Sequence, residues 1–170
     1  SIHQRPESVK NRKQFGHWEL DTMVSSRGKS KGTFATFVER TSRFFLAFKI
    51  PDRTSLSMNQ VISTLRKKLP RKAMRTATVD RGSEFAGHME LKKELKLHLY
   101  FADPYCSWQR GSNENANGLL REFFPKKTDL ALVKEEELQR ALFLINSRPR
   151  KCLGWKTPYE VFLDKLSHLN

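Results

Sequence analysis

Apolar side chains alternate with polar ones in the first half of the chain, as in half-buried β-strands. Within 17–24, for example, Trp18, Leu20, Thr22 and Val24 fall on one face. Two runs rich in aromatic and β-branched residues follow, close enough to form a hairpin beside this strand. Two shorter apolar runs predict further strands. The five predicted strands are residues 17–24, 33–40, 43–50, 75–79 and 97–101.

Helical spacing of apolar residues predicts helices between and after these strands. Ile62, Leu65 and Leu69 recur at helical intervals, with Thr54 or Ser55 as the N-cap. The predicted helices lie near residues 55–69, 84–96, 112–124, 138–145 and 158–166. Residues 1–16 are polar and predict an irregular lead-in to one domain at 17–170. This order predicts an α/β fold, a five-stranded mixed sheet with helices on both faces.

Positive charge is the strongest signal in the composition. The chain has 32 Lys and Arg against 18 Asp and Glu, a net charge of +14. Six cations fall within residues 66–75, beginning with Arg66, Lys67 and Lys68. Such an excess favours a polyanionic partner, because neutralised phosphates release condensed counterions. A solvated basic surface is the alternative for any single cluster.

The cysteines and the apolar segments indicate where in the cell the protein is located. Cys106 and Cys152 lie far apart and outside any metal-binding spacing, which favours free thiols in the cytoplasm. The longest apolar runs are too short to span a membrane, and the first fifteen residues lack the apolar stretch of a secretory signal. We therefore expect a cytoplasmic protein.

Three carboxylates stand out by their positions. Asp21 lies within a predicted strand among apolar residues, where an unpaired carboxylate costs several kcal/mol. It pairs either with a buried Arg or Lys or with a metal ion. Asp80 closes a strand, where ligands of open α/β sheets gather, although a turn also favours Asp. Glu114 lies near a helix start, where the helix dipole alone would favour an acid.

The predicted helix at 112–124 has two distinct faces. Its apolar stripe contains Ala116, Leu120 and Phe124, whereas Glu114, Asn117, Gly118 and Arg121 lie on the other side. Glycine inside a helix costs about 1 kcal/mol relative to alanine. Gly118 would, however, allow a phosphate backbone to approach closely. This polar face is therefore a candidate surface for a nucleic acid.

Three segments carry a family resemblance. They are WELDT at Trp18–Thr22, VDRGSEF at Val79–Phe85 and WQRGSNENANGLLR at Trp108–Arg121. Together they resemble the three acidic motifs of DDE transposases, with 33 residues between the second Asp and the Glu. This spacing and the long third motif are similar to the bacterial insertion sequence thirty family, within the retroviral integrase superfamily. The closing segment 153–162 is also typical of these catalytic domains.

This resemblance implies a ribonuclease H-like fold, that of the retroviral integrase catalytic core. It also implies metal-dependent DNA cleavage and strand transfer by direct transesterification during transposition. Asp21, Asp80 and Glu114 would be catalytic and would bind two Mg²⁺ ions, or Mn²⁺ as a substitute, with Asp21 bridging them. The partners would be double-stranded DNA, both transposon ends and target, and further copies in an active homo-oligomer at the bacterial nucleoid.

Basic and amide side chains near the motifs are the expected DNA contacts. These are Arg110, Asn117, Arg121, Lys126, Lys127, Arg66, Lys67 and Lys68. Trp108 could stack on a base or pack in the core. His88 could act near the acids or be a packing residue. The family's N-terminal helix-turn-helix is absent from this sequence, which begins at Ser1, so we expect it to lie in a longer protein.

One residue departs from the superfamily pattern. Arg81 replaces the usual Asn after the second Asp, and it could point toward the metal or toward DNA.

Other functions are alternatives to transposition. A ribonuclease H or junction resolvase would share the sheet and the acids, although the third motif argues against both. A catalytically silent DNA-binding module would explain the charge but not Asp21. The Tyr and Arg-His-x-x-Arg set of a tyrosine recombinase is not found in the sequence.

Overall fold

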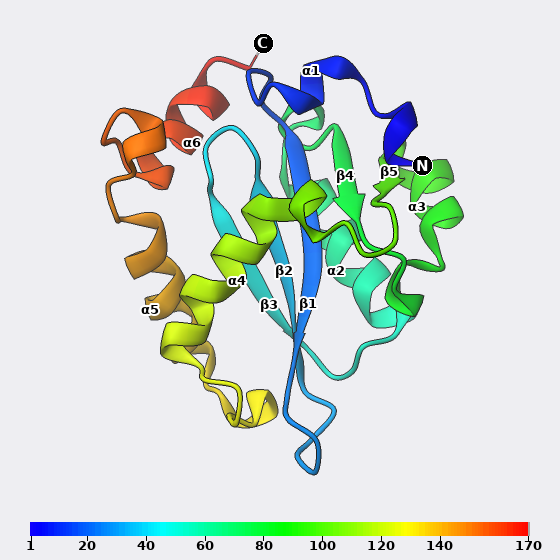
Figure 1. Cartoon of the computed structure of the whole chain (residues 1–170), viewed down its shortest axis with the longest axis vertical. Coiled ribbons are helices and arrows are strands. Elements are labelled where there is room, and N and C mark those ends of the chain that lie inside the picture. Colours follow the sequence, from blue (N-terminus) through cyan, green and yellow to red (C-terminus); the bar gives the residue numbers. More distant parts are fainter. Residues whose placement is uncertain (170) are drawn as a thin grey trace.

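A five-stranded mixed sheet forms the centre of the molecule (Figure 1). The computed structural model describes residues 1–169. Its strands are β1 (His17–Val24), β2 (Thr33–Glu39), β3 (Phe45–Ile50), β4 (Thr76–Val79) and β5 (His98–Phe101). They lie in the order β3-β2-β1-β4-β5, with the first three antiparallel and β1, β4 and β5 parallel. The predicted sheet is confirmed.

Helices cover both faces of this sheet. They are α1 (Glu7–Lys10), α2 (Ser55–Lys68), α3 (His88–Leu95), α4 (Gly111–Phe123), α5 (Glu135–Asn146) and α6 (Pro158–Ser167). Short 3-10 helices occur at Ile2–Gln4, Arg71–Ala73, Ser83–Phe85, Ser107–Arg110, Leu130–Leu132 and Lys151–Leu153. In Figure 1, α4 crosses the front of the sheet and α2 lies behind it. The sheet therefore has one hydrophobic core on each face.

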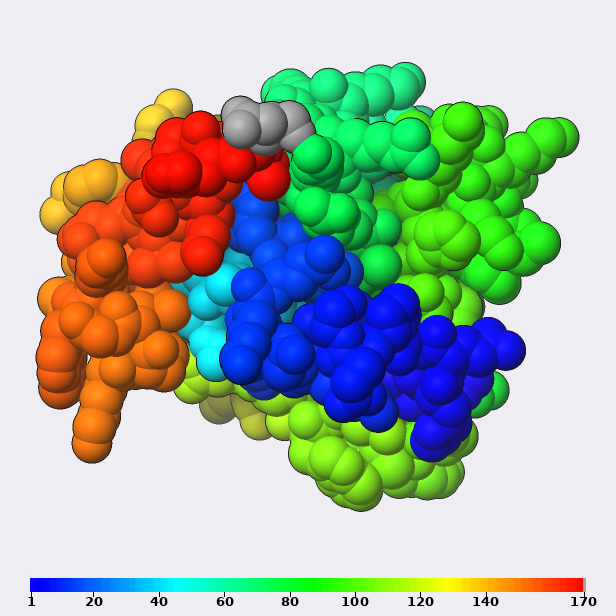
Figure 2. All heavy atoms as spheres, turned by 90° about the horizontal axis from the view of Figure 1, so that it is seen from above, coloured from blue at the N-terminus to red at the C-terminus, as the bar shows by residue number. Residues whose placement is uncertain are grey.

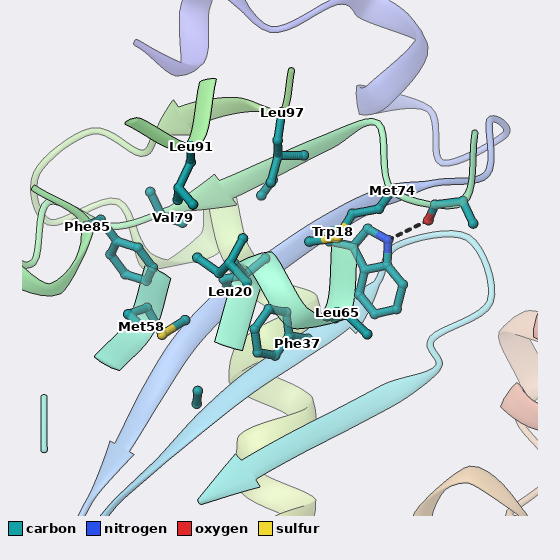
Figure 3. Packing of buried hydrophobic residues seen from close by; sticks show 14 of the residues in the cluster. Trp18, Leu20, Phe37, Met58, Leu65, Met74, Val79, Phe85, Leu91 and Leu97 are labelled. Carbon is teal, nitrogen blue, oxygen red and sulfur yellow. Dashed lines mark hydrogen bonds between the residues drawn. The ribbon is translucent and has the colours of Figure 1, made fainter. Parts of the chain in front are cut away.

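Alternation along β1 divides its side chains between these cores. Trp18 and Leu20 are fully buried with residues of α2 and α3 (Figure 3). The Trp18 indole donates a hydrogen bond to the Ala73 carbonyl at 2.8 Å. Met23 lies in the second core with residues of α4 and α5. Because Val24 is 42% exposed, the end of β1 emerges from the core.

Two helix starts show how local chemistry determines the elements. Thr54 caps α2, as predicted, by accepting a hydrogen bond from the Ser57 N–H. The helix predicted from Glu84 instead begins at His88, after a separate 3-10 turn. Gly87 separates them, and a Cβ there would lie 2.4 Å from the Asn59 side chain. Gly87 therefore allows the start of α3 to pack closely against α2.

Residues 1–16 differ from the irregular lead-in that we expected. They contain two short helices, and Ile2, Val9 and Phe15 are buried. Arg5 also donates a hydrogen bond to the Thr78 hydroxyl of β4 at 3.0 Å. Figure 2, seen from above, shows this blue segment lying across the end of the molecule where β1 begins. The segment is thus packed onto the sheet, because its apolar side chains complete the core there.

Candidate active site

Asp21 and Asp80 approach each other because β1 and β4 are parallel neighbours. Glu19 pairs with Thr78 in the register; Asp21 lies two residues farther along β1, and Asp80 directly follows the last residue of β4. Their carboxylates share one partner, the Arg110 guanidinium. Arg110 Nη1 lies 3.3 Å from Asp21 Oδ2, and Nη2 lies 3.6 Å from Asp80 Oδ2. The two acids therefore converge on one positive charge.

Burial dominates the electrostatics of Asp21. It raises the pKa of this carboxyl, and the charge of Asp80 raises it further. The Arg110 charge and the Thr22 N–H oppose this rise, the latter by a 2.8 Å hydrogen bond to Asp21 Oδ1. The Asn117 amide donates to the other oxygen at 3.3 Å. Asp21 is thus held in place, but its charge is incompletely stabilised.

Glycine 82 orients the second aspartate. Its N–H donates a 2.8 Å hydrogen bond to Asp80 Oδ1. A Cβ on Gly82 would lie 2.9 Å from that oxygen and 2.2 Å from Glu84 Oε2. A larger residue at position 82 would therefore displace one or both carboxylates from this turn.

Glu84 brings a further carboxylate close to the pair. It is fully buried, and its Oε1 accepts hydrogen bonds from Thr22 at 3.0 Å and from Arg53 at 2.8 Å. Its Oε2 has no hydrogen-bond partner among residues 1–169. The sequence predicted that a helix begins at this residue. Glu84 does lie in a first helical turn, but its burial beside Thr22 appears only when the strands are assembled.

Glu114 is exposed on α4 and lies apart from the two aspartates. Helical spacing places it between Arg110 and Asn117 on one face, and both of these residues contact Asp21. Within residues 1–169, no group of three His, Cys, Asp or Glu is close enough to hold a metal ion. The structure thus brings two of the three predicted acids together and presents the third on an adjoining helix face.

The donor set fits a divalent cation. Two carboxylates already surround a positive charge at this position. The side-chain oxygen of Asn117 is buried there and has no hydrogen-bond partner within residues 1–169. Carboxylate and amide oxygens are ligands that Mg²⁺ and Ca²⁺ accept. A metal ion would therefore replace Arg110 as the cation between the aspartates.

Comparison with known proteins identifies the family. Residues 11–107 match the family model described as "Integrase core domain". The chain belongs to this family. Its match contains Asp21 and Asp80 and ends before Glu114.

Sequence relatives specify the type of integrase core. The chain is 42% identical over 160 residues to the transposase InsI for insertion sequence element IS30C from Escherichia coli, covering 94% of this chain and 41% of that protein. It is 40% identical over 168 residues to the transposase for IS1086 from Cupriavidus metallidurans, covering 99% and 49%. The resemblance to the insertion sequence thirty family is thereby confirmed. The chain spans less than half the length of these curated relatives.

A solved structure confirms the predicted ribonuclease H-like fold. The catalytic core domain of BIV integrase aligns with a TM-score of 0.67 at 25% identity, covering 87% of this chain and 93% of that one. Within residues 1–169, no helix of this integrase core is long and apolar enough to cross a membrane.

The α4 helix of this integrase core is anchored by a residue that we did not predict. Glu19 is fully buried and forms an ion pair with Arg40. Its other oxygen accepts a 2.8 Å hydrogen bond from the Asn113 N–H, and its carbonyl accepts one from the Asn113 amide at 3.0 Å. Burial raises the pKa of Glu19, and Arg40 and the Asn113 N–H oppose this. Its position on the same strand face as Asp21 was the available signal.

The expected DNA contacts along α4 fall into two groups. Arg110 lies between the aspartates with a side chain only 12% exposed, and Asn117 contacts Asp21. Arg121 is half-buried and donates a hydrogen bond to the Val24 carbonyl at 3.0 Å. Lys126 and Lys127, by contrast, are exposed. In this conformation, therefore, Arg110 and Asn117 contact the aspartates, Arg121 binds the end of β1, and the two lysines remain available for a ligand.

Arg66, Lys67 and Lys68 lie at a different end of the molecule. They close α2, and Arg66 lines an open pocket near the starts of β4 and β5, together with other basic residues. Asp80 follows the opposite end of β4. The cluster is thus separated from the acids by the length of a strand, and its contact with DNA stays a prediction.

Three further residues have distinct surroundings. Arg81 is exposed, and its Nε donates to the Ala102 carbonyl at 3.4 Å. The His88 ring packs edge-on against Phe101, with ring centroids 4.8 Å apart. Trp108 is 72% exposed, so it does not pack in the core and its indole is available for stacking.

Proposed function

We propose that this chain is a catalytic core that cleaves DNA strands and joins them during transposition. The observation that carries the proposal is the convergence of Asp21 and Asp80 on one cation from adjacent parallel strands. The family and its relatives, which are transposases, support DNA as the substrate. The excess of positive charge supports a polyanion.

Asp21, Asp80 and Glu114 would hold two Mg²⁺ ions in this proposal. When bound, such ions would polarise the phosphodiester and lower the pKa of the attacking hydroxyl. Thr22 and Asn117 orient the Asp21 carboxylate, and Gly82 orients that of Asp80. Arg110 must leave the space between them. Glu114 extends from the helix face that Asn117 already places against Asp21.

The biological setting is part of the same proposal. Transposon ends and target DNA would be the partners, and several copies would form the active complex in the bacterial cytoplasm, at the nucleoid. Because the relatives are more than twice as long, the remaining part of such a protein would recognise the transposon ends. The core itself would then bind DNA mainly through phosphates.

Substitution of each acid in the full-length protein tests this function. We expect Asp21→Asn, Asp80→Asn and Glu114→Gln each to reduce Mg²⁺-dependent cleavage of transposon-end duplexes to the metal-free level. Glu90→Gln, an exposed acid of α3, is the matched control and should cleave normally. Thermal unfolding shows whether each variant folds.

Three outcomes would contradict the proposal in different ways. Full activity in folded Asp21→Asn or Asp80→Asn would exclude a catalytic metal site at these two carboxylates. Full activity in Glu114→Gln alone would exclude Glu114 as the third ligand, and the buried Glu84 would be the next acid to substitute. Preference for RNA–DNA hybrids or four-way junctions over transposon ends would favour a ribonuclease H or a resolvase.

A further inference from the structure

Three arginines meet in a cavity beside the first turn of α4. Arg12 comes from the segment after α1, Arg43 from the β2–β3 turn and Arg150 from the loop after α5. The cavity has a volume of about 230 Å³ and is also lined by Ser112 and Asn115. None of its described lining residues is acidic. Side chains far apart in sequence thus place three guanidinium groups around a cavity whose remaining lining is polar and apolar but carries no carboxylate.

The arginines lack a negatively charged partner. Arg12 and Arg43 both donate to the Ser112 hydroxyl, at 2.7 and 3.1 Å, and Arg43 also donates to the Arg40 carbonyl at 2.8 Å. Arg150 donates weakly to the Ile145 carbonyl at 3.4 Å, and its buried Nε has no hydrogen-bond partner among residues 1–169. Across the same residues, none of the three forms an ion pair with a carboxylate. One neutral hydroxyl therefore serves two guanidiniums.

Electrostatics favours an anion at this position. Burial lowers the pKa of Arg150. The nearby Cys152 opposes this, and the neighbouring charges of Arg148 and Arg43 lower the pKa further. The first turn of α4, at Gly111 and Ser112, adds the positive end of a helix dipole. An anion placed among the guanidiniums would relieve this repulsion and satisfy the free donors.

We propose that this arginine pocket binds one backbone phosphate of a DNA strand that runs beside α4. Guanidinium groups present paired donors that match phosphate oxygens, which favours Arg over Lys at such a site. Ser112 could add a hydrogen bond from its hydroxyl. Because Ser112 precedes Glu114 by two residues, a seated phosphate would also brace the helical turn that presents Glu114. The choice of DNA as the anion rests on the proposed function.

Metal-free DNA binding by the full chain tests the pocket. In EDTA, we expect the double variant Arg43→Gln/Arg150→Gln to bind a short duplex about tenfold more weakly than the unmodified protein. The slope of log affinity against log salt concentration is negative, and we expect its magnitude to decrease by up to about 0.9, the value for one phosphate contact. Fluorescence anisotropy over a salt series measures both quantities.

A matched control removes two positive charges outside the pocket. Lys134→Gln/Arg140→Gln changes two exposed residues at α5 and should leave affinity and slope nearly unchanged. Equal losses in the two double variants would overturn the proposal. The single variants Arg43→Gln and Arg150→Gln, each with a smaller expected loss, decide the matter if the double variant fails to fold.

Inorganic phosphate distinguishes the possible sources of the anion. If phosphate raises the melting temperature of the unmodified chain but not of the pocket variant, and DNA affinity is equal in both, the pocket belongs to a free phosphate compound and the DNA proposal fails. Because these measurements contain no metal, failure of metal-dependent cleavage would overturn the proposed function and leave this test unaffected.

Discussion

Glu19 and Asp21 lie two residues apart on the same face of β1, yet their surroundings differ. The Glu19 side chain is fully buried, and its two oxygens are occupied by Arg40 and the Asn113 N–H. The Asp21 side chain is 20% exposed, and its contacts with Arg110 and Asn117 are both 3.3 Å long. Charged hydrogen bonds are normally 2.7–2.9 Å long. Both oxygens of Glu19 therefore have close partners, whereas in Asp21 only Oδ1 has a short hydrogen bond, from the Thr22 N–H, and the contacts of Oδ2 are long.

This difference separates a structural acid from a reactive one. Glu19 has no free oxygen to offer and instead anchors α4. Asp21 shares its cationic partner with Asp80 and lies where β1 emerges from the core. A long Arg side chain can leave such a position without breaking the fold. The closed pair, Glu19 with Arg40, thus sets the position of α4. The open pair, Asp21 and Asp80 with Arg110 between them, leaves room for Arg110 to be exchanged for a metal ion.

Removing Arg40 should have the largest effect on stability. Arg40→Met would leave the buried Glu19 carboxylate without its countercharge, which costs about 3–5 kcal/mol for buried pairs. Urea unfolding measures this loss. Arg148→Met is the matched control, because its pair with Glu122 is exposed and worth at most about 1 kcal/mol. Equal losses in the two variants would mean that the Glu19–Arg40 pair does not anchor the helix.

His17, two residues before Glu19, should make stability depend on pH. Burial lowers the pKa of His17 from 6.5 to about 4, and Arg75, Arg40 and Arg5 contribute. In the unfolded chain His17 gains a proton below about pH 6.5, whereas in the folded chain it does so only near pH 4. This contribution to stability is therefore complete above pH 6.5 and is lost as the pH falls to 4. It amounts to about 3 kcal/mol.

Unfolding free energies measured from pH 7.5 to pH 4 test this contribution. Relative to the unmodified chain, His17→Asn should show a flatter profile across that window. The exposed His168 provides the comparison, since His168→Asn should leave the profile unchanged. A profile for His17→Asn parallel to that of the unmodified chain would contradict the assignment.

The sequence predicted the sheet because alternating apolar residues must be buried. The approach of Asp21 to Asp80 was implied only by the resemblance to DDE transposases, since the strand pattern did not show that β1 and β4 are parallel neighbours. The position of Arg110 could not be predicted, because the conformation of a long side chain depends on what surrounds it. The role of Glu19 required knowing that α4 docks on β1. Similarly, the close packing of Gly87 on Asn59 can be seen only once α2 is placed beside α3.

Replacing Arg110 should produce the smallest effect and the most direct test of the open pair. Arg110→Gln removes the cation that a metal ion must displace, and it leaves Asp21 and Asp80 with uncompensated repulsion. We therefore expect Mn²⁺ to bind this variant about two- to tenfold more tightly, as calorimetry without DNA would measure, since partly exposed pairs contribute about 1 kcal/mol or less. Arg81→Gln, an exposed arginine next to Asp80 in sequence, is the control and should change the affinity little. Weaker Mn²⁺ binding by Arg110→Gln would show that the guanidinium supports the metal site instead of occupying its place, and Asp21 would then resemble Glu19 in having a permanent partner.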